Sequence, residues 1–140
     1  MDALVPTVAE LEANTVVRAA VEAAWVDSLP ADPQRRHEEG GWIYLDPMTG
    51  EIAVVRARPG ARSAINLSNP PERVGCFVVG KFHTHPNPAA DGWATGPSAG
   101  DIRADDSHGV PDLIRAENKI HYSGPERRRG GLGGNPGYPA

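Results

Sequence analysis

The longest run of strand-forming residues in the sequence is VGCFVVGKFHTH, residues 74–85. β-Branched and aromatic residues are frequent in it, and such residues favour a pleated, half-buried backbone. We therefore predict a central β-strand over this stretch. Because side chains alternate between the two faces of a strand, His83 and His85 should point to the same side at its C-terminal end. The same alternation places Cys76 on the opposite face, as a buried structural thiol.

On either side of this strand, the sequence predicts helices and hairpins. Apolar residues recur with helical spacing over residues 15–28, and two apolar runs around a turn with Pro and Gly predict a β-hairpin over 41–57. A loop rich in breakers, residues 86–97, separates the long strand from a short helix over 98–108. A second hairpin is expected over 113–122. This order predicts a mixed α/β fold.

The chain has 140 residues, which is enough for one domain of ordinary size. We expect that domain to span residues 1–125, with no regular element before residue 14. Residues 126–140 contain several glycines and a run of three arginines but little that could be buried. They are therefore expected to form a flexible tail.

Charge and cysteine content narrow the classes of function. The chain has 14 Lys and Arg residues against 18 Asp and Glu, a formal net charge of −4. Binding to nucleic acid needs a positive surface, so we expect no nucleic-acid partner. Cys76, the single cysteine, can form neither an internal disulfide nor a thiolate zinc site. A metal would have to be bound by histidines and carboxylates.

The hydropathy pattern argues against a membrane protein. The first residues lack a basic region followed by an apolar run, and no stretch approaches the roughly 20 apolar residues of a membrane span. We expect a soluble cytoplasmic protein with no membrane partner. Secretion as a toxin domain is the alternative.

Two histidines on one face of a strand end could bind a single metal ion. His83 and His85 would supply two ligands, and Asp101, in the first turn of the predicted helix, is the natural third. Three protein ligands leave one tetrahedral position for a water molecule, whose pKa zinc lowers to about 7. The sequence therefore predicts a Zn²⁺ site built from these three residues.

Hydrolysis at such a site also needs a proton acceptor and a group that stabilises the oxyanion. Glu38 and Glu39 precede the glycines that open the first predicted strand, and either carboxylate could take the proton. Ser98 could donate a hydrogen bond to the oxyanion. With the metal ligands, these residues complete a set suited to amide hydrolysis.

Each motif also has a simpler interpretation. Ser98 and Asp101 fit a helix N-cap with its capping box, and two adjacent glutamates before glycines are typical of a solvated turn. A lone His-x-His pair in a strand is common. The three motifs in this order, with Pro86 directly after the second histidine, favour the metal site.

The remaining aromatic and histidine residues near these motifs have simpler assignments. His37, His108 and His121 lack a partner at a ligand spacing, so we expect surface or loop positions and assign them no role. Trp93 lies in the polar loop before the short helix. It would either pack that loop down or line a substrate groove, and both possibilities stay open.

The sequences EEGG (38–41), HTHP (83–86) and SAGD (98–101) resemble the JAMM signature of the JAB/MPN metallopeptidases, a glutamate followed by H-x-H-P and S-x-x-D. The resemblance spans roughly residues 15–125. It implies a single JAB/MPN-like domain with a curved, mixed and largely antiparallel β-sheet flanked by helices.

The resemblance also implies roles for individual residues. Zinc would be bound by His83, His85 and Asp101, with Ser98 stabilising the oxyanion. The family spacing favours Glu38 over Glu39 as the catalytic base, and the choice between them stays open at this point.

One departure from the family concerns the loop after the second histidine. Twelve residues, 86–97, separate His85 from Ser98, more than is typical of the family. In this the chain is more similar to the JAB-like domains of bacterial polymorphic toxins and stand-alone bacterial proteins than to eukaryotic deubiquitinases.

The implied activity is that of a zinc metallopeptidase or isopeptidase. The bond cleaved would be a peptide or isopeptide bond at the C-terminus of a ubiquitin-like protein or of another protein substrate. One alternative is a non-catalytic MPN-type protein-binding module, and another is the effector domain of a toxin system. A nuclease or phosphoesterase would be expected to need a second metal and a basic surface.

Overall fold

The structure is a computed structural model that describes residues 5–126 and 137–138. Its five strands form one sheet in the order β2-β1-β3-β4-β5. β3 and β4 are parallel, and the other neighbouring pairs are antiparallel. The prediction of a mixed α/β fold around a central strand is confirmed. The strands are β1 (Gly40–Leu45), β2 (Ile52–Arg56), β3 (Phe77–Thr84), β4 (Asp112–Ala116) and β5 (Lys119–Ser123).

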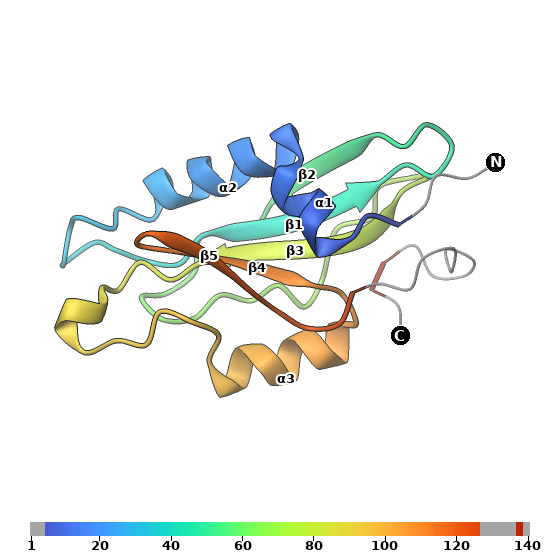
Figure 1. Ribbon diagram of the computed structural model, residues 1–140. Helices are drawn as coiled ribbons and strands as arrows, with labels where there is room; N and C mark the ends of the chain where they lie inside the picture. Colours follow the sequence, from blue (N-terminus) through green and yellow to red (C-terminus); the bar gives the residue numbers. More distant parts are fainter. Residues whose placement is uncertain (1–4, 127–136, 139–140) are drawn as a thin grey trace.

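Helices cover both faces of this sheet (Figure 1). α1 (Val8–Ala13) and α2 (Thr15–Asp27) lie on one face, and α3 (Ala99–His108) lies on the other. A short 3-10 helix, η1 (Ala89–Asp91), lies in the loop between β3 and α3. The predicted helix over 15–28 is confirmed to within one residue, and both predicted hairpins are present.

The expectation of no regular element before residue 14 is wrong, because α1 forms there. Its N-cap is Thr7, whose side chain accepts a hydrogen bond from the backbone of Glu10, while the Glu10 carboxylate accepts one from the backbone of Thr7. This capping box satisfies two backbone donors at the helix start. Val8 and Leu11 anchor the helix by packing into the core beneath α2.

A β-bulge in β3 changes which side chains share a face of the sheet. Ile43 of β1 pairs with Gly80, whereas the next residue, Tyr44, pairs with Val78, so Val79 is left without a partner across the ladder. Val79 packs into the core under α1 and α2, as Gly80 does. The alternation is thereby shifted by one residue.

Because of this shift, the predicted position of Cys76 is wrong. Cys76 and Val78 pack in the core cluster on the α3 side, the same side as His83. The cysteine is buried, as expected. The predicted strand over 74–85 is also shorter at its start, where Gly75 adopts a positive φ of 77°.

The start of β1 lies unusually close to the end of β3. Gly40 pairs with His83, and a Cβ atom at Gly40 would lie 2.3 Å from the carbonyl oxygen of Phe82. A side chain would therefore push the two strands apart. The glycine lets the chain just before β1, which carries Glu38, run beside the histidine end of β3.

The C-terminal residues that the structure describes contact the α3 face of the sheet. The Tyr138 ring stacks on His108, and its hydroxyl accepts from the Trp42 indole and donates to the backbone oxygen of Leu67. Tyr138 is partly buried, so at least this residue of the predicted tail 126–140 packs against the domain. Residues 127–136 and 139–140 of that tail lie outside the described residues.

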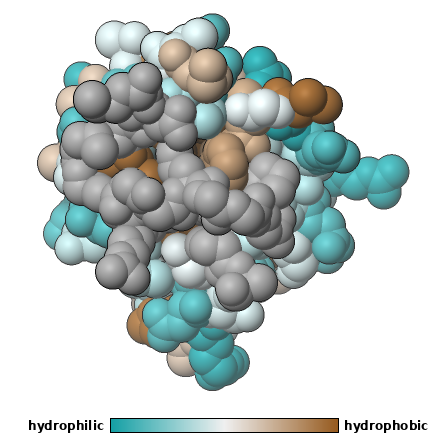
Figure 2. Space-filling model, turned by 90° about the vertical axis from the view of Figure 1, so that its right-hand side faces the viewer, coloured by the Kyte–Doolittle hydropathy of each residue, from teal (hydrophilic) through white to brown (hydrophobic). Residues whose placement is uncertain are grey.

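The surface gives little sign of an apolar interface on the side shown in Figure 2. Among the described residues in view there, most are hydrophilic and the hydrophobic ones occupy small separate areas. Among the described helices, none combines the length and apolar character that a membrane crossing requires.

Candidate metal centre

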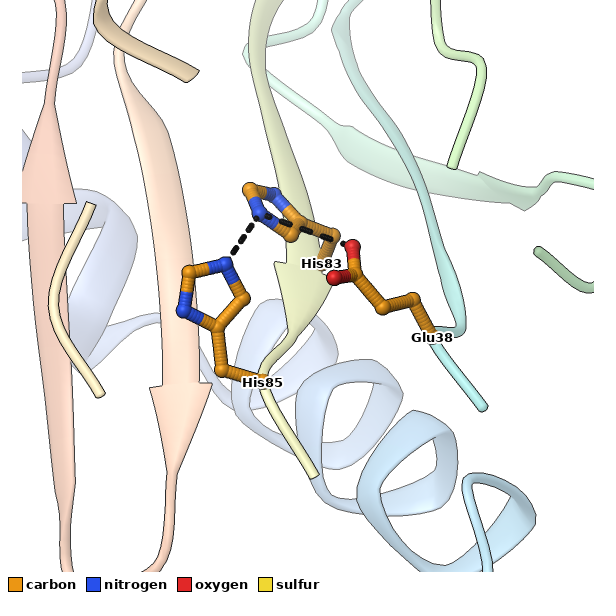
Figure 3. A group of neighbouring side chains, drawn as sticks. All are labelled: Glu38, His83 and His85. Carbon is orange, nitrogen blue, oxygen red and sulfur yellow. Dashed lines mark hydrogen bonds and ion pairs between the residues drawn. The ribbon is translucent and has the colours of Figure 1, made fainter. Parts of the chain in front are cut away.

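The two histidines at the end of β3 face each other. Their Nε2 atoms are 3.1 Å apart (Figure 3). β3 ends at Thr84, but the backbone amide of His85 still donates to the carbonyl of Arg115 in β4. The extended pairing keeps the period of two, so the prediction that both rings share a face is confirmed.

Both rings are held through their other nitrogen. The Nδ1 of His83 lies 3.0 Å from a carboxylate oxygen of Asp112, and the Nδ1 of His85 lies 3.2 Å from the backbone oxygen of Thr95. Since a carboxylate and a carbonyl can only accept, each Nδ1 carries the proton. When the rings are neutral, the Nε2 lone pairs are free to bind a metal ion.

Asp101 completes the group from the start of α3. Its carboxylate oxygens lie 3.4 Å from the Nε2 of His83 and 3.2 Å from the Nε2 of His85. The same carboxylate accepts from the backbone amide of Ser98, whose hydroxyl accepts from the amide of Asp101. The capping-box interpretation is confirmed, and it is compatible with the metal-site interpretation because the same carboxylate faces the histidines.

The spacing of these donors fits a tetrahedral ion. The two Nε2 atoms and the Asp101 oxygens are separated by 3.1, 3.2 and 3.4 Å. An ion with bonds of about 2.0–2.1 Å holds neighbouring tetrahedral donors roughly 3.3–3.4 Å apart. Glu38, His83 and His85 also form a group whose ligand atoms all lie within 4.8 Å of one another. That group could hold a metal ion, and Asp101 approaches both of its histidines, His83 through one carboxylate oxygen and His85 through the other.

Glu38 lies beside the histidines, and Glu39 does not. An oxygen of Glu38 is 4.0 Å from the Nε2 of His83 (Figure 3). The Glu39 carboxylate is held instead by His37, at 2.6 Å, and by Arg56, at 2.7 Å. The geometry selects Glu38 as the carboxylate that can act at the site.

The ionisation of Glu38 suits a group that takes and returns a proton. The residue is 5% exposed, and burial raises the pKa of its carboxyl to about 7, against the opposing effect of His83 and His85. A base with a pKa near neutrality combines the right protonation state with a useful driving force for proton transfer.

Asp112 is a residue of this group that the sequence analysis missed. It is buried at the start of β4 and bonds to His83 through the parallel β3–β4 pairing. Burial lowers the pKa of His83, but the carboxylates of Asp112 and Asp101 outweigh it and raise the pKa well above its usual value. The available signal was an acidic residue at the start of a strand whose next two residues, Leu113 and Ile114, are apolar.

A cavity of about 180 Å³ opens onto this group. Glu38, His85 and Asp101 lie on its wall together with Ser98 and Trp93. The Trp93 side chain is 42% exposed. Of the two roles left open for this residue, the structure favours a groove-lining side chain.

The other three histidines are not simple surface residues. His37 holds Glu39, and His108 accepts at Nδ1 from the ammonium group of Lys81, 2.7 Å away. All three, including His121, are partly buried. The expectation of a surface or loop position holds for His37, in the loop before β1, and is wrong for His108, which ends α3, and for His121, which lies in β5.

No protein-family model, curated protein or solved structure matches this chain. Within residues 5–126 and 137–138, one group of histidines and carboxylates has the spacing of a metal site. The function is therefore argued from that group and the cavity beside it.

Proposed function

We propose that the protein is a zinc-dependent peptidase or isopeptidase of the JAMM type. The observation that carries the proposal is the position of Glu38, a buried carboxylate 4.0 Å from one of two histidines whose Nε2 atoms converge. A purely structural metal site would need no such neighbouring base. The mixed sheet flanked by helices is compatible with the JAB/MPN fold.

The residues divide into ligands and a base. His83, His85 and Asp101 hold the zinc ion, since two imidazoles and a carboxylate are a common ligand set for catalytic zinc. When bound, zinc supplies Lewis-acid chemistry and lowers the pKa of water toward neutrality. The Glu38 carboxylate accepts the proton of the attacking water and later delivers it to the leaving amine.

Ser98 stabilises the oxyanion in this proposal. A hydroxyl group can accept one hydrogen bond and donate another. Its oxygen accepts from the amide of Asp101, which leaves the O–H proton to donate into the cavity. The helix cap and the oxyanion contact are therefore compatible.

The substrate is proposed to be a protein chain, with cleavage at the C-terminus of a ubiquitin-like domain or at a comparable peptide bond. The Trp93 indole offers a bound chain an apolar wall in the cavity beside these residues. The loop over residues 86–97 forms much of this wall, so it selects which chain enters.

The proposal is tested by zinc content and cleavage. Protein purified without chelator is expected to contain about one zinc per chain, and a His83→Ala/His85→Ala variant none. Wild type is then assayed on ubiquitin-like fusions beside Glu38→Gln. A protein that binds zinc but cleaves no peptide substrate, and captures ubiquitin-like proteins equally with or without Glu38, would be a binding module instead.

A further inference from the structure

Helix α3, which carries Asp101, is attached to the sheet by charge rather than by an apolar face. Asp105 is the one residue of the helix that is fully buried. Ile102, its largest apolar side chain, is 45% exposed. Surface helices normally dock through an apolar stripe, so another contact must fix this helix.

That contact is Lys81 of β3. Its ammonium nitrogen lies 2.8 Å from a carboxylate oxygen of Asp105 and 2.7 Å from the Nδ1 of His108. Lys81 is 2% exposed and Asp105 is completely buried. One side chain of the sheet thus holds two consecutive turns of the helix at its C-terminal half.

Lys81 and Asp105 lie on the same faces of β3 and α3 as two of the proposed metal ligands. Asp101 precedes Asp105 by four residues, so both lie on one face of α3. His83 follows Lys81 by two residues, so both lie on one face of β3. A pair that fixes Asp105 against Lys81 therefore fixes Asp101 against His83, one helical turn and two strand residues away.

Asp105 is also connected to His83 through Asp112. Its carboxyl lies near that of Asp112, whose charge helps to raise its pKa, and it accepts from the hydroxyl of Ser123 in β5. Asp112 in turn holds the Nδ1 of His83. Asp105 therefore acts on ligands from two different elements, Asp101 on the helix and His83 on the strand.

We infer that Lys81 and Asp105 are positioning residues of the metal centre, which set the separation of Asp101 from the two histidines. Burying an ion pair is costly, and an apolar pair of similar volume often stabilises a fold as well or better. Stability alone does not account for the charges here, whereas the position of the Lys81 ammonium group between Asp105 and His108, both on α3, does. The inference rests on the proposed metal function but not on the identity of the substrate.

Cobalt binding tests this inference, because tetrahedral Co²⁺ has a visible spectrum that reports ligand geometry. Asp105→Asn is expected to weaken Co²⁺ affinity by roughly 10- to 100-fold, as for other residues that orient metal ligands, and to alter that spectrum. Asp106→Asn, on the exposed face of the same helix, should bind as wild type does. Wild-type affinity and spectrum in Asp105→Asn would overturn the inference.

A second variant covers the case in which Asp105→Asn does not fold. Lys81→Met keeps the length of the side chain, and Asp105, whose pKa burial already raises to about 6, can take up a proton once its partner is lost. This variant should fold and show the same loss of affinity and the same spectral change. Unchanged binding would overturn the inference here as well.

A stability control separates positioning from general weakening. Val21→Ala removes a buried side chain of α2, on the opposite face of the sheet. It should lower the melting temperature and leave Co²⁺ affinity unchanged. If it weakens binding as much as Lys81→Met, the effect is one of stability and the inference fails. A wild-type chain that binds no cobalt would overturn the proposed metal function itself, and this inference with it.

Discussion

Glu38 and His83 come from neighbouring segments whose backbones touch, and their side chains meet with the carboxylate oxygen 4.0 Å from Nε2. Because Glu38 lies beside the ligands rather than among the closest donors, removing its charge should separate metal binding from hydrolysis. Glu38→Gln is expected to keep its zinc and to lose roughly 100- to 10,000-fold in the rate of cleavage. Zinc content and single-turnover cleavage measure the two effects.

Glu39→Gln is the control for this first prediction. It breaks the pairs with His37 and Arg56, so it should lower the melting temperature but retain cleavage in the fraction that is folded. If cleavage is lost only in Glu39→Gln, Glu39 and not Glu38 is the catalytic base.

Gly40→Ala should damage both the fold and the site. The added Cβ would lie 2.3 Å from the Phe82 carbonyl, so β1 must move away from β3. We expect a loss of about 1–3 kcal/mol in the free energy of unfolding and weaker metal binding. Urea denaturation and zinc titration measure these. Gly75→Ala, at a positive φ with open space around it, should cost about 1–2 kcal/mol and leave metal binding intact.

Asp112→Asn should weaken zinc affinity by roughly 10- to 100-fold, because the amide no longer supplies the charge that orients the His83 ring. Competition with a chelator of known affinity gives the value. Zinc affinity equal to that of wild type would show that the contact does not support the ligand.

Asp105 makes stability depend on pH in the acidic range. Burial and the neighbouring Asp112 raise the pKa of its carboxyl from 3.8 to about 6. A raised folded-state pKa gives a stabilising contribution that is complete below pH 4 and lost as the pH rises through 6. The stability of wild type relative to Asp105→Asn should therefore fall over this interval, by on the order of 3 kcal/mol. Denaturation curves from pH 4 to 7 test this, and a constant difference would contradict it.

Trp93→Ala should change substrate binding and not the metal. The indole lies on the cavity wall and is 42% exposed, so its loss removes contact area for a bound chain. We expect KM to rise several-fold for a protein substrate, with zinc content unchanged and little change in kcat. An unaltered KM would return Trp93 to the role of packing the loop.

Local patterns in the sequence predicted much of the fold and the assembly of the site. The apolar spacing of Val17, Val21 and Ala24 marked α2, and the long β-like run marked the central strand. The three motif segments, far apart in sequence, lie together in the structure. The helical spacing, the β-like run and each single motif segment are patterns of residues that lie close to one another in the chain.

What the sequence did not predict depends on long-range geometry. The bulge at Val79 follows from how β1 and β3 pair, so the face of Cys76 could not be read from alternation alone. Asp112 reaches His83 only because β4 runs parallel to β3. The partners of Lys81 come from a helix that folds back over the sheet, and a lysine in a strand is usually exposed.

The Asp101 carboxylate serves two purposes at once, as the first-turn acceptor of α3 and as a ligand of the proposed ion. Helix formation and ion uptake are then thermodynamically linked, because each holds the carboxylate where the other needs it. Chelation should loosen the start of α3 and the loop before it, and reloading should restore them. Under this assignment the ion stabilises the fold as well as serving the reaction, and resistance to unfolding should rise with the concentration of free zinc.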